Sequence, residues 1–228
     1  QVSIDGTPVS FGTVTPGSVQ SIVVNGGSGG NAVDLGSVSP SSFTNGGGVI
    51  VTVNALGGND SLTGSAFSDT LNGGDGADSI IGGEGNDLID GGSGDNQLFG
   101  DAGSDTISGL FGRDLIRGGD DGDLLNGGNG FDTLAGERGD DTIIGGNGND
   151  TVFGGVGRDS VTGGSGNDQL FGDNGFDTIS GGLGNDFLRG GLGEDQLFGD
   201  DGQDELFGDS HNDRLNGGGG SDTITAGD

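Results

Sequence analysis

A single aliphatic residue recurs at every ninth position through most of the chain. From Leu62 to Ile224 this residue is always Leu, Ile or Val, and most of its neighbours are polar or aromatic. Six residues rich in Gly, Asn and Asp separate each such triplet from the next. One inward aliphatic between two outward side chains is the alternation of a very short β-strand, and a Gly in every turn of the pattern excludes helix. The pattern therefore predicts short strands joined by glycine-rich turns.

The nine-residue spacing is an internal repeat. Residues 55–225 divide into 19 units without insertion or deletion, and units such as 145–153 and 163–171 read G-G-x-G-N-D-x-U-x, where U is aliphatic. The first position is Gly in every unit except the one that begins at Ala55, and the sixth is Asp in every unit except the one that carries Asn96. A fixed short period of this kind indicates a solenoid.

The repeat also predicts how the strands stack. One such short strand cannot bury its apolar face alone, whereas strands stacked about 4.8 Å apart bury a continuous stripe. Two units make one flattened coil, with turns on alternate sides, so that unit n lies beside unit n+2. The expected fold is all-β, a solenoid of about nine and a half parallel coils.

The part of the chain before Ala55 departs from this regularity. Residues 26–34 read as a degraded unit with Asn31 in the place of the Asp, and β-branched runs flank them. We expect residues 19–54 to form degenerate first coils and residues 55–228 to form the regular roll. Residues 1–18, which contain Pro8 and Pro16, are either an N-terminal cap or the end of a preceding domain.

The composition explains why such a chain needs a ligand. Its 228 residues include 60 Gly, 36 acidic residues, six Arg and no Lys, which gives a net charge of −30, and only 28% of the residues are hydrophobic. Such a chain stays disordered unless a partner neutralises it. Its charge argues against nucleic acid and against anionic membranes, and no apolar run approaches the roughly 18 residues of a membrane span. The absence of Cys excludes disulfides and thiolate metal sites.

The turns offer the ligands that calcium prefers. Ca²⁺ takes six to eight oxygen ligands from carboxylates and main-chain carbonyls, and glycines let several carbonyls converge. An ion between stacked turns would also screen the repulsion between successive carboxylates. Up to about 17 Ca²⁺ ions are expected, one for each gap between stacked turns. The candidate ligands are the sixth residues of the units: Asp60, Asp69, Asp78, Asp87, Asn96, Asp105, Asp114, Asp123, Asp132, Asp141, Asp150, Asp159, Asp168, Asp177, Asp186, Asp195, Asp204, Asp213 and Asp222.

On these 19 tandem units the chain resembles the RTX, or hemolysin-type, calcium-binding repeat family. The resemblance implies a right-handed parallel β-roll with Ca²⁺ in both rows of turns, on secreted or cell-surface proteins that typically leave the cell by type I secretion. Some units depart from the motif: Asn96 lacks the charge, Phe67 replaces the turn glycine, and Asp121 and His211 replace the fourth-position Gly. Weaker binding is expected at those turns.

No enzyme site is expected. Gly208-Asp209-Ser210 beside His211 is explained as positions of one repeat, and His211 is the only histidine in the chain. The repeated Asp residues provide no unique pair of the kind that glycosidases use.

The outward aromatic residues suggest a partner. Phe99, Phe153, Phe171 and Phe207 occupy ninth positions of units that share one face, and Phe187 extends the stripe. An exposed aromatic stripe is typical of an interface, although the rings could instead pack on their own sheet. The leading hypothesis is therefore an extracellular, non-enzymatic calcium-binding roll with a structural role, such as a surface-layer, matrix or filament component. The alternative is a calcium-triggered secretion and folding module of a larger secreted enzyme, toxin or adhesin.

Overall fold

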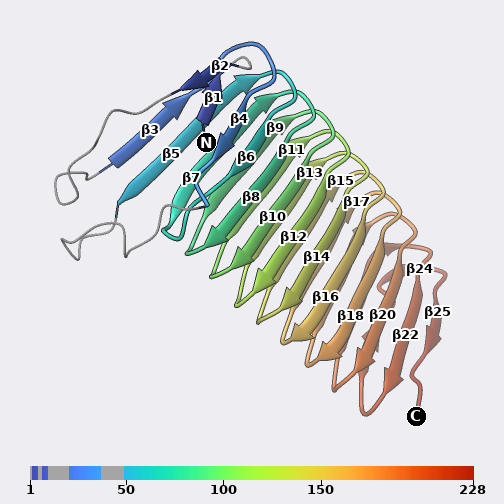
Figure 1. Cartoon of the computed structure of the whole chain (residues 1–228). Coiled ribbons are helices and arrows are strands. Elements are labelled where there is room, and N and C mark those ends of the chain that lie inside the picture. The colour runs from blue at the N-terminus through green and yellow to red at the C-terminus, as the bar shows by residue number, and fades with distance from the viewer. Residues whose placement is uncertain (1, 5–6, 10–20, 37–48) are drawn as a thin grey trace.

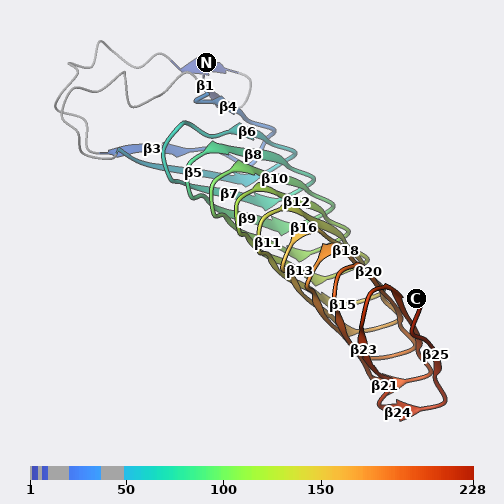
Figure 2. The same cartoon turned by 90° about the horizontal axis from the view of Figure 1, so that it is seen from below.

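The computed structural model describes residues 2–4, 7–9, 21–36 and 49–228, and every regular element among them is a β-strand. The strands lie side by side along one elongated body, with β1 at one end and β25 at the other (Figures 1 and 2). Two sheets form the two layers of this body. The expected all-β solenoid is confirmed.

The first sheet has 13 strands and the second has 12. In spatial order the first sheet contains β2 (Thr7–Val9), β1 (Val2–Ile4), β4 (Ala32–Asp34), β6 (Ser61–Thr63), β8 (Ser79–Glu84), β10 (Gln97–Ala102), β12 (Leu115–Asp120), β14 (Thr133–Arg138), β16 (Thr151–Gly157), β18 (Gln169–Gly175), β20 (Phe187–Leu192), β22 (Glu205–Ser210) and β25 (Thr223–Thr225). The second contains β23 (Arg214–Asn216), β21 (Gln196–Gly202), β19 (Thr178–Leu183), β17 (Ser160–Ser165), β15 (Thr142–Asn147), β13 (Leu124–Asn129), β11 (Thr106–Phe111), β9 (Leu88–Ser93), β7 (Asp69–Asp75), β5 (Ile50–Gly57) and β3 (Ser21–Asn25), with β24 (Gly219–Gly220) beside β21.

The register confirms two nonapeptides per coil. In β10, Leu98 lies beside Ile80 of β8 and beside Ile116 of β12, each two units away in the sequence, and all three strands are parallel. Most strands are longer than expected, because those from β7 to β22 continue from the last three positions of one unit into the first three of the next. The true turn is therefore short and consists only of the residues between two strands, such as 103–105 between β10 and β11.

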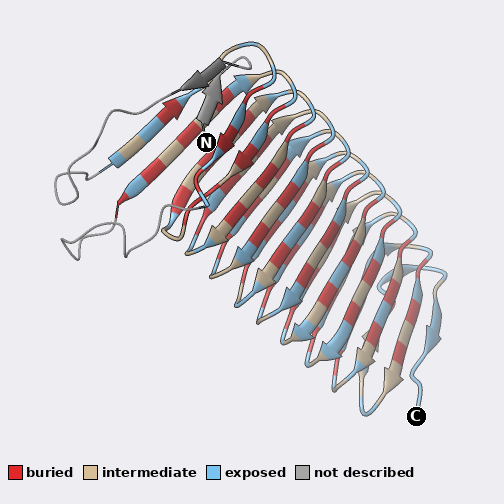
Figure 3. Ribbon diagram, viewed as in Figure 1, coloured by how far each residue is buried: buried red, intermediate tan, exposed pale blue. Residues whose placement is uncertain are grey.

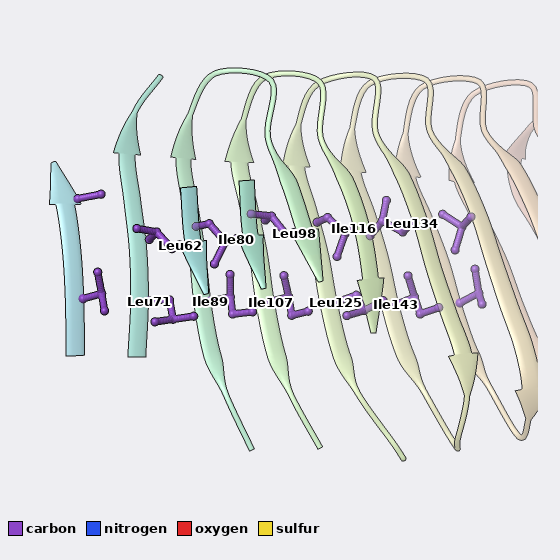
Figure 4. Close-up of a cluster of buried hydrophobic side chains, with 14 of the residues drawn as sticks. Leu62, Leu71, Ile80, Ile89, Leu98, Ile107, Ile116, Leu125, Leu134 and Ile143 are labelled. Atoms are coloured by element: carbon purple, nitrogen blue, oxygen red, sulfur yellow. The ribbon is translucent and has the colours of Figure 1, made fainter. Parts of the chain in front are cut away.

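The core is a double file of aliphatic side chains. The eighth residue of each unit from Leu62 to Leu206 is at most 1% exposed, and the files from the two sheets face each other (Figure 4). Along the strands from β3 to β22 the buried positions alternate with exposed or half-buried ones (Figure 3). One buried aliphatic residue per nine is a thin core, since each contributes only about 1.5–3 kcal/mol.

The N-terminal strands join both sheets. β3 pairs in parallel with β5, and β4 pairs in parallel with β6. Ala32 lies beside Ser61, so these paired strands are separated by a longer stretch of chain than the two units of a regular coil. β1 is antiparallel to both β2 and β4 and so extends the first sheet beyond β4. Residues 10–20 and 37–48, which belong to the expected cap and first coils, lie outside the described residues, and the domain boundaries at residues 18 and 54 stay predictions.

Two positions of each unit, one in the strand and one in the turn, favour a left-handed backbone. The second residue adopts positive φ in every unit except that of Ser65, and the fourth does so in most; the majority are Gly, for example Gly146 (φ 114°) and Gly148 (φ 134°). Asp121 and His211, which replace the fourth-position Gly, take the same conformation, with φ of 75° and 85°. A non-glycine residue there costs about 1–2 kcal/mol, so these substitutions leave the turn in place but strain it.

Candidate metal centre

The sixth-position residues end each turn and lie immediately before, or at the start of, the next strand. Those from Asp60 to Asp204, including Asn96, are at most 3% exposed, whereas Asp213 and Asp222 in the last coil are half-buried. The structure thus gathers the candidate ligands into two buried rows, one at each edge of the roll. We call the row that contains Asp60 and Asn96 the first row and the row that contains Asp69 and Asp87 the second row.

One oxygen of each buried carboxylate serves the main chain. The Asp150 N–H donates to Asp168 Oδ1 at 2.8 Å, and the Asp168 N–H donates to Asp186 Oδ1 at 2.8 Å. The same bond joins each sixth residue to the one two units later along both rows. An amide oxygen can accept such a bond equally well. The bond to Oδ1 therefore requires a side chain of the size of Asp or Asn, but it does not require a negative charge.

In most of the row Asp residues the second carboxylate oxygen has no protein partner. In 16 of the Asp side chains Oδ2 is fully buried without a hydrogen bond. An unpaired buried charge is among the most costly arrangements in a folded protein, and polar groups of this kind are normally satisfied. Their regular recurrence indicates a ligand that is common to all of them.

Two asparagines reveal what surrounds this atom. Asn31 occupies the same place in the first row, and its Nδ2 donates to the Gly29 carbonyl at 2.7 Å and to the Ala55 carbonyl at 3.2 Å. Asn96 Nδ2 donates to the Gly94 carbonyl at 3.0 Å. The atom at the Oδ2 place therefore faces the carbonyl of the fourth residue in its own turn and, in the case of Asn31, the carbonyl of the first residue in the next coil.

The glycine at the first position shows that these oxygens converge in the Asp turns as well. A Cβ on Gly145 would lie 2.7 Å from Asp150 Oδ2 and 2.7 Å from the Gly163 carbonyl oxygen. A carboxylate oxygen and a carbonyl oxygen therefore face the same small space, which no side chain fills. Oxygens without a hydrogen between them repel one another, whereas a hard cation is attracted by all of them.

The electrostatics of the rows agree with this geometry. Burial, the largest cause, and the neighbouring carboxylates raise the pKa values of several row residues far above the usual 3.8. The pKa is raised to about 7 for Asp87, Asp123, Asp132, Asp168 and Asp177, and to about 6 for Asp105, Asp159 and Asp186. Without a cation, the negatively charged form of these carboxylates is therefore disfavoured.

The second row begins with a turn that satisfies its own carboxylate. Ser65 donates to Asp69 twice, from its N–H to Oδ2 at 2.5 Å and from its hydroxyl to Oδ1 at 2.9 Å. Asp69 is accordingly not among the side chains with an orphaned oxygen. The irregular sequence around Phe67 thus coincides with a turn in which protein donors occupy both carboxylate oxygens.

The fifth-position residues have a role that the repeat alone did not reveal. The side-chain oxygen of Asn149 accepts the Asn167 N–H at 2.9 Å, and Asn167 and Asn185 repeat this bond toward the next coil at 2.7 and 2.8 Å. These exposed side chains thus link successive turns on the outer surface, while the buried Asp rows link them on the inside. The frequent Asn at this position was the signal for it.

Other candidate sites receive less support. Within the described residues no three Asp, Glu or His side chains converge as a metal cluster, so each candidate site combines carbonyls with few carboxylates. His211 is exposed, and its Nδ1 lies 2.8 Å from the Ser210 carbonyl oxygen, within a strained turn. No helix in the described part of the chain is long and apolar enough to cross a membrane.

The phenylalanines of the first sheet form a continuous stack. The rings of Phe153 and Phe171 are parallel at 5.0 Å, and Phe187 joins Phe171 and Phe207 at 5.8 and 5.4 Å. Phe99 lies apart from this stack, because β12 and β14 separate its strand from β16. Much of the ring surface is thus covered by neighbouring rings, although Phe153 remains 36% exposed.

Sequence comparisons agree with the geometry. The model of the RTX calcium-binding nonapeptide repeat, which spans four copies, matches residues 54–89, 63–98, 90–125, 99–134, 126–161, 162–197 and 190–224. A comparison with curated proteins gives no match. The matched segments together cover residues 54–224, which is nearly all of the regular roll.

Proposed function

Because the chain belongs to the RTX calcium-binding nonapeptide repeat family, we propose that it binds Ca²⁺ in both rows of turns and folds as it does so. The buried, unpartnered Oδ2 atoms carry this proposal. The ligands would be the sixth-position carboxylates together with the carbonyls that face them. A bound Ca²⁺ supplies the positive charge that these oxygens lack.

The number of orphaned oxygens sharpens the expected stoichiometry. The repeat gives 17 gaps between stacked turns, whereas 16 Asp side chains have a buried Oδ2 without a partner. Three of the 19 sixth-position residues are not among them: Asp69 and Asn96, whose turns hold protein donors or an amide in the place of the ion, and the half-buried Asp222 of the last coil. We therefore expect about 16 ions, whose charge would nearly balance the net −30 of the chain.

Calcium-coupled folding suits an extracellular structural role. Extracellular calcium modules bind at roughly 0.1–1 mM, so such a chain would stay unfolded where calcium is scarce and fold where it is plentiful. Repeats of this family are typically non-catalytic. The alternative role, as the secretion and folding module of a larger secreted protein, uses the same calcium chemistry.

Circular dichroism of the whole chain tests the proposal. In EGTA the spectrum should show disorder over most of the chain, and millimolar CaCl₂ should convert it to β structure, while MgCl₂ at the same concentration should not. Native mass spectrometry should then count about 16 bound Ca²⁺. Identical spectra in EGTA and in CaCl₂ would rule out folding coupled to calcium.

A further inference from the structure

The first coil of the roll differs from the rest in how its turn is closed. Asn31 is 3% exposed. The Gly29 and Ala55 carbonyl oxygens each accept a hydrogen bond from its amide, whereas a carboxylate at this position would repel them. Asn31 Nδ2 also donates to Asp60 Oδ1 at 3.0 Å, and its main-chain N–H donates to the same oxygen at 2.5 Å. This turn is complete with protein atoms alone.

The first turn of the second row is also complete. Ser65 supplies both donors to Asp69, as described above. The two rows therefore start, at the same end of the molecule, with turns that need no cation. Across residues 21–36 and 49–72 only Asp60 retains an orphaned Oδ2, whereas the other 15 such atoms belong to the coils that follow.

Residues 21–36 and 49–72 also bury more hydrophobic side chains per residue than the rest of the roll. They contain nine buried hydrophobic side chains, namely Val24, Val33, Leu35, Val49, Val51, Val53, Ala55, Leu62 and Leu71. The stretch 73–216, which is more than three times as long, contains only 15. The density of the core is thus about twice as high in the first segment, which matters because hydrophobic burial must replace the ion if the coils are to stand without one.

The low charge of residues 21–36 and 49–72 and the strand that covers their edge also favour folding of this segment without a cation. Only three of the 36 acidic residues, Asp34, Asp60 and Asp69, belong to it. An amide ladder crosses its outer face, in which Asn72 donates to Asn54 at 2.8 Å and Asn54 donates to Asn25 at 2.9 Å. β1 pairs with β4 and so covers one of its open edges.

We propose that residues 21–36 and 49–72 form a calcium-independent seed, on which the remaining coils assemble when calcium binds. Each new coil needs a formed neighbour, because its sixth residue bonds to, and its strands pair with, the adjacent coil. The seed offers this neighbour before any ion is bound. The direction of folding would then run from the seed toward residue 228. This inference rests on the proposed calcium-coupled folding of the other coils.

Hydrogen exchange of the whole chain, read by mass spectrometry, tests the seed. In EGTA, peptides from residues 21–36 and 49–63 should exchange at least about 10-fold more slowly than peptides from 100–216, and CaCl₂ should protect both regions. Uniformly fast exchange in EGTA, followed by protection in CaCl₂, would overturn the seed but keep calcium-coupled folding. Strong protection of both regions in EGTA would overturn the calcium-coupled folding itself.

Asn31→Asp provides the sharper variant. It keeps the shape of the side chain but places a carboxylate oxygen against the Gly29 and Ala55 carbonyls, so the protection of the seed in EGTA should be lost and CaCl₂ should restore it. Asn25→Asp is the matched control, because it makes the same change in the same coil on an exposed side chain and keeps the oxygen that accepts the Asn54 amide N–H. Equal loss of protection in both variants, or unchanged protection in Asn31→Asp, would contradict the role of the Asn31 amide.

Discussion

Replacing Asp168 by Asn tests why the roll needs a cation. Asp168 is 1% exposed, its Oδ1 accepts the Asp150 N–H at 2.8 Å, and its Oδ2 has no partner. Asn keeps the size and the Oδ1 acceptor, and it should place an N–H toward the Gly166 and Gly181 carbonyls, as Asn31 does in its own turn. The substitution thus removes one buried charge and supplies the missing donor.

The pKa of Asp168 sets the magnitude without metal. Burial, together with the nearby Asp150 and Asp186, raises this pKa from 3.8 to about 7. A folded-state pKa above the unfolded one means that the metal-free roll is most stable below pH 3.8 and loses stability as the pH rises through about 7. The loss is about 1.4 kcal/mol per pH unit, or at most about 4 kcal/mol at pH 7. Asn should recover about 2–4 kcal/mol at pH 7 and almost nothing at pH 4.

In calcium the sign should reverse, because Asn removes a charged ligand. We would follow β structure by circular dichroism in EGTA from pH 7 to pH 4, where acid should promote metal-free folding and Asp168→Asn should move the midpoint to a higher pH. In CaCl₂ the variant should bind fewer ions and unfold at lower urea. Asp201→Asn, on an exposed side chain, is the control and should do neither.

Two results would refute the reasoning. A variant that is less stable in EGTA as well as in CaCl₂ would mean that the carboxylate stabilises the turn without a cation. A chain that gains no β structure in EGTA at any pH between 4 and 7 would mean that carboxylate charge is not what prevents metal-free folding.

Two further substitutions test the turns and the aromatic face. Leu110 has a φ of 70°, so Leu110→Gly should stabilise the calcium-loaded roll by about 1 kcal/mol in urea unfolding. Leu183→Gly, at an exposed site without positive φ, is the control and should not stabilise it. Equal effects of the two substitutions would show that the left-handed backbone at Leu110 carries no strain. Phe171 is a central ring of the phenylalanine stack, so if copies associate through this face, Phe171→Ser should convert a calcium-dependent oligomer to monomer in sedimentation, whereas Phe111→Ser on the other sheet should not. Unchanged sedimentation of Phe171→Ser would remove the interface.

The repeat predicted the regular part of the fold because each unit contains the whole of its local structure. The eighth-position aliphatic residue identifies the strand, and the invariant period fixes the register at two units, as the pairing of Leu98 with Ile116 confirms. The extension of each strand into the next unit could not be predicted, because Gly and Asp are poor strand formers and only the stacked neighbour makes them pair. The positive φ of non-glycine residues such as Asp101 and Leu110 could not be predicted either, because their side chains disfavour that conformation.

The candidate site was predictable in composition but not in its exceptions. The sequence identifies the sixth-position residues, yet Asn31 and Asn96 look like damaged copies until the structure shows their amide hydrogens on the turn carbonyls. The unit of Phe67 looks as if it has only lost its turn glycine until the two bonds from Ser65 to Asp69 are seen. A substitution that removes an ion ligand can therefore add a hydrogen-bond donor that satisfies the turn carbonyls. Comparison with the sequence motif detects only the lost ligand.

The difference between a carboxylate and an amide at one position thus decides whether a coil depends on its surroundings. An amide at the sixth position carries its own hydrogens and closes the turn at once, whereas a carboxylate leaves an oxygen that only a proton or a cation can satisfy. A roll built with amides throughout would need no calcium but would fold wherever it was made. Amide and hydroxyl closures at the start, followed by carboxylates, leave a short segment that can order by itself and a long one that must wait for the ion.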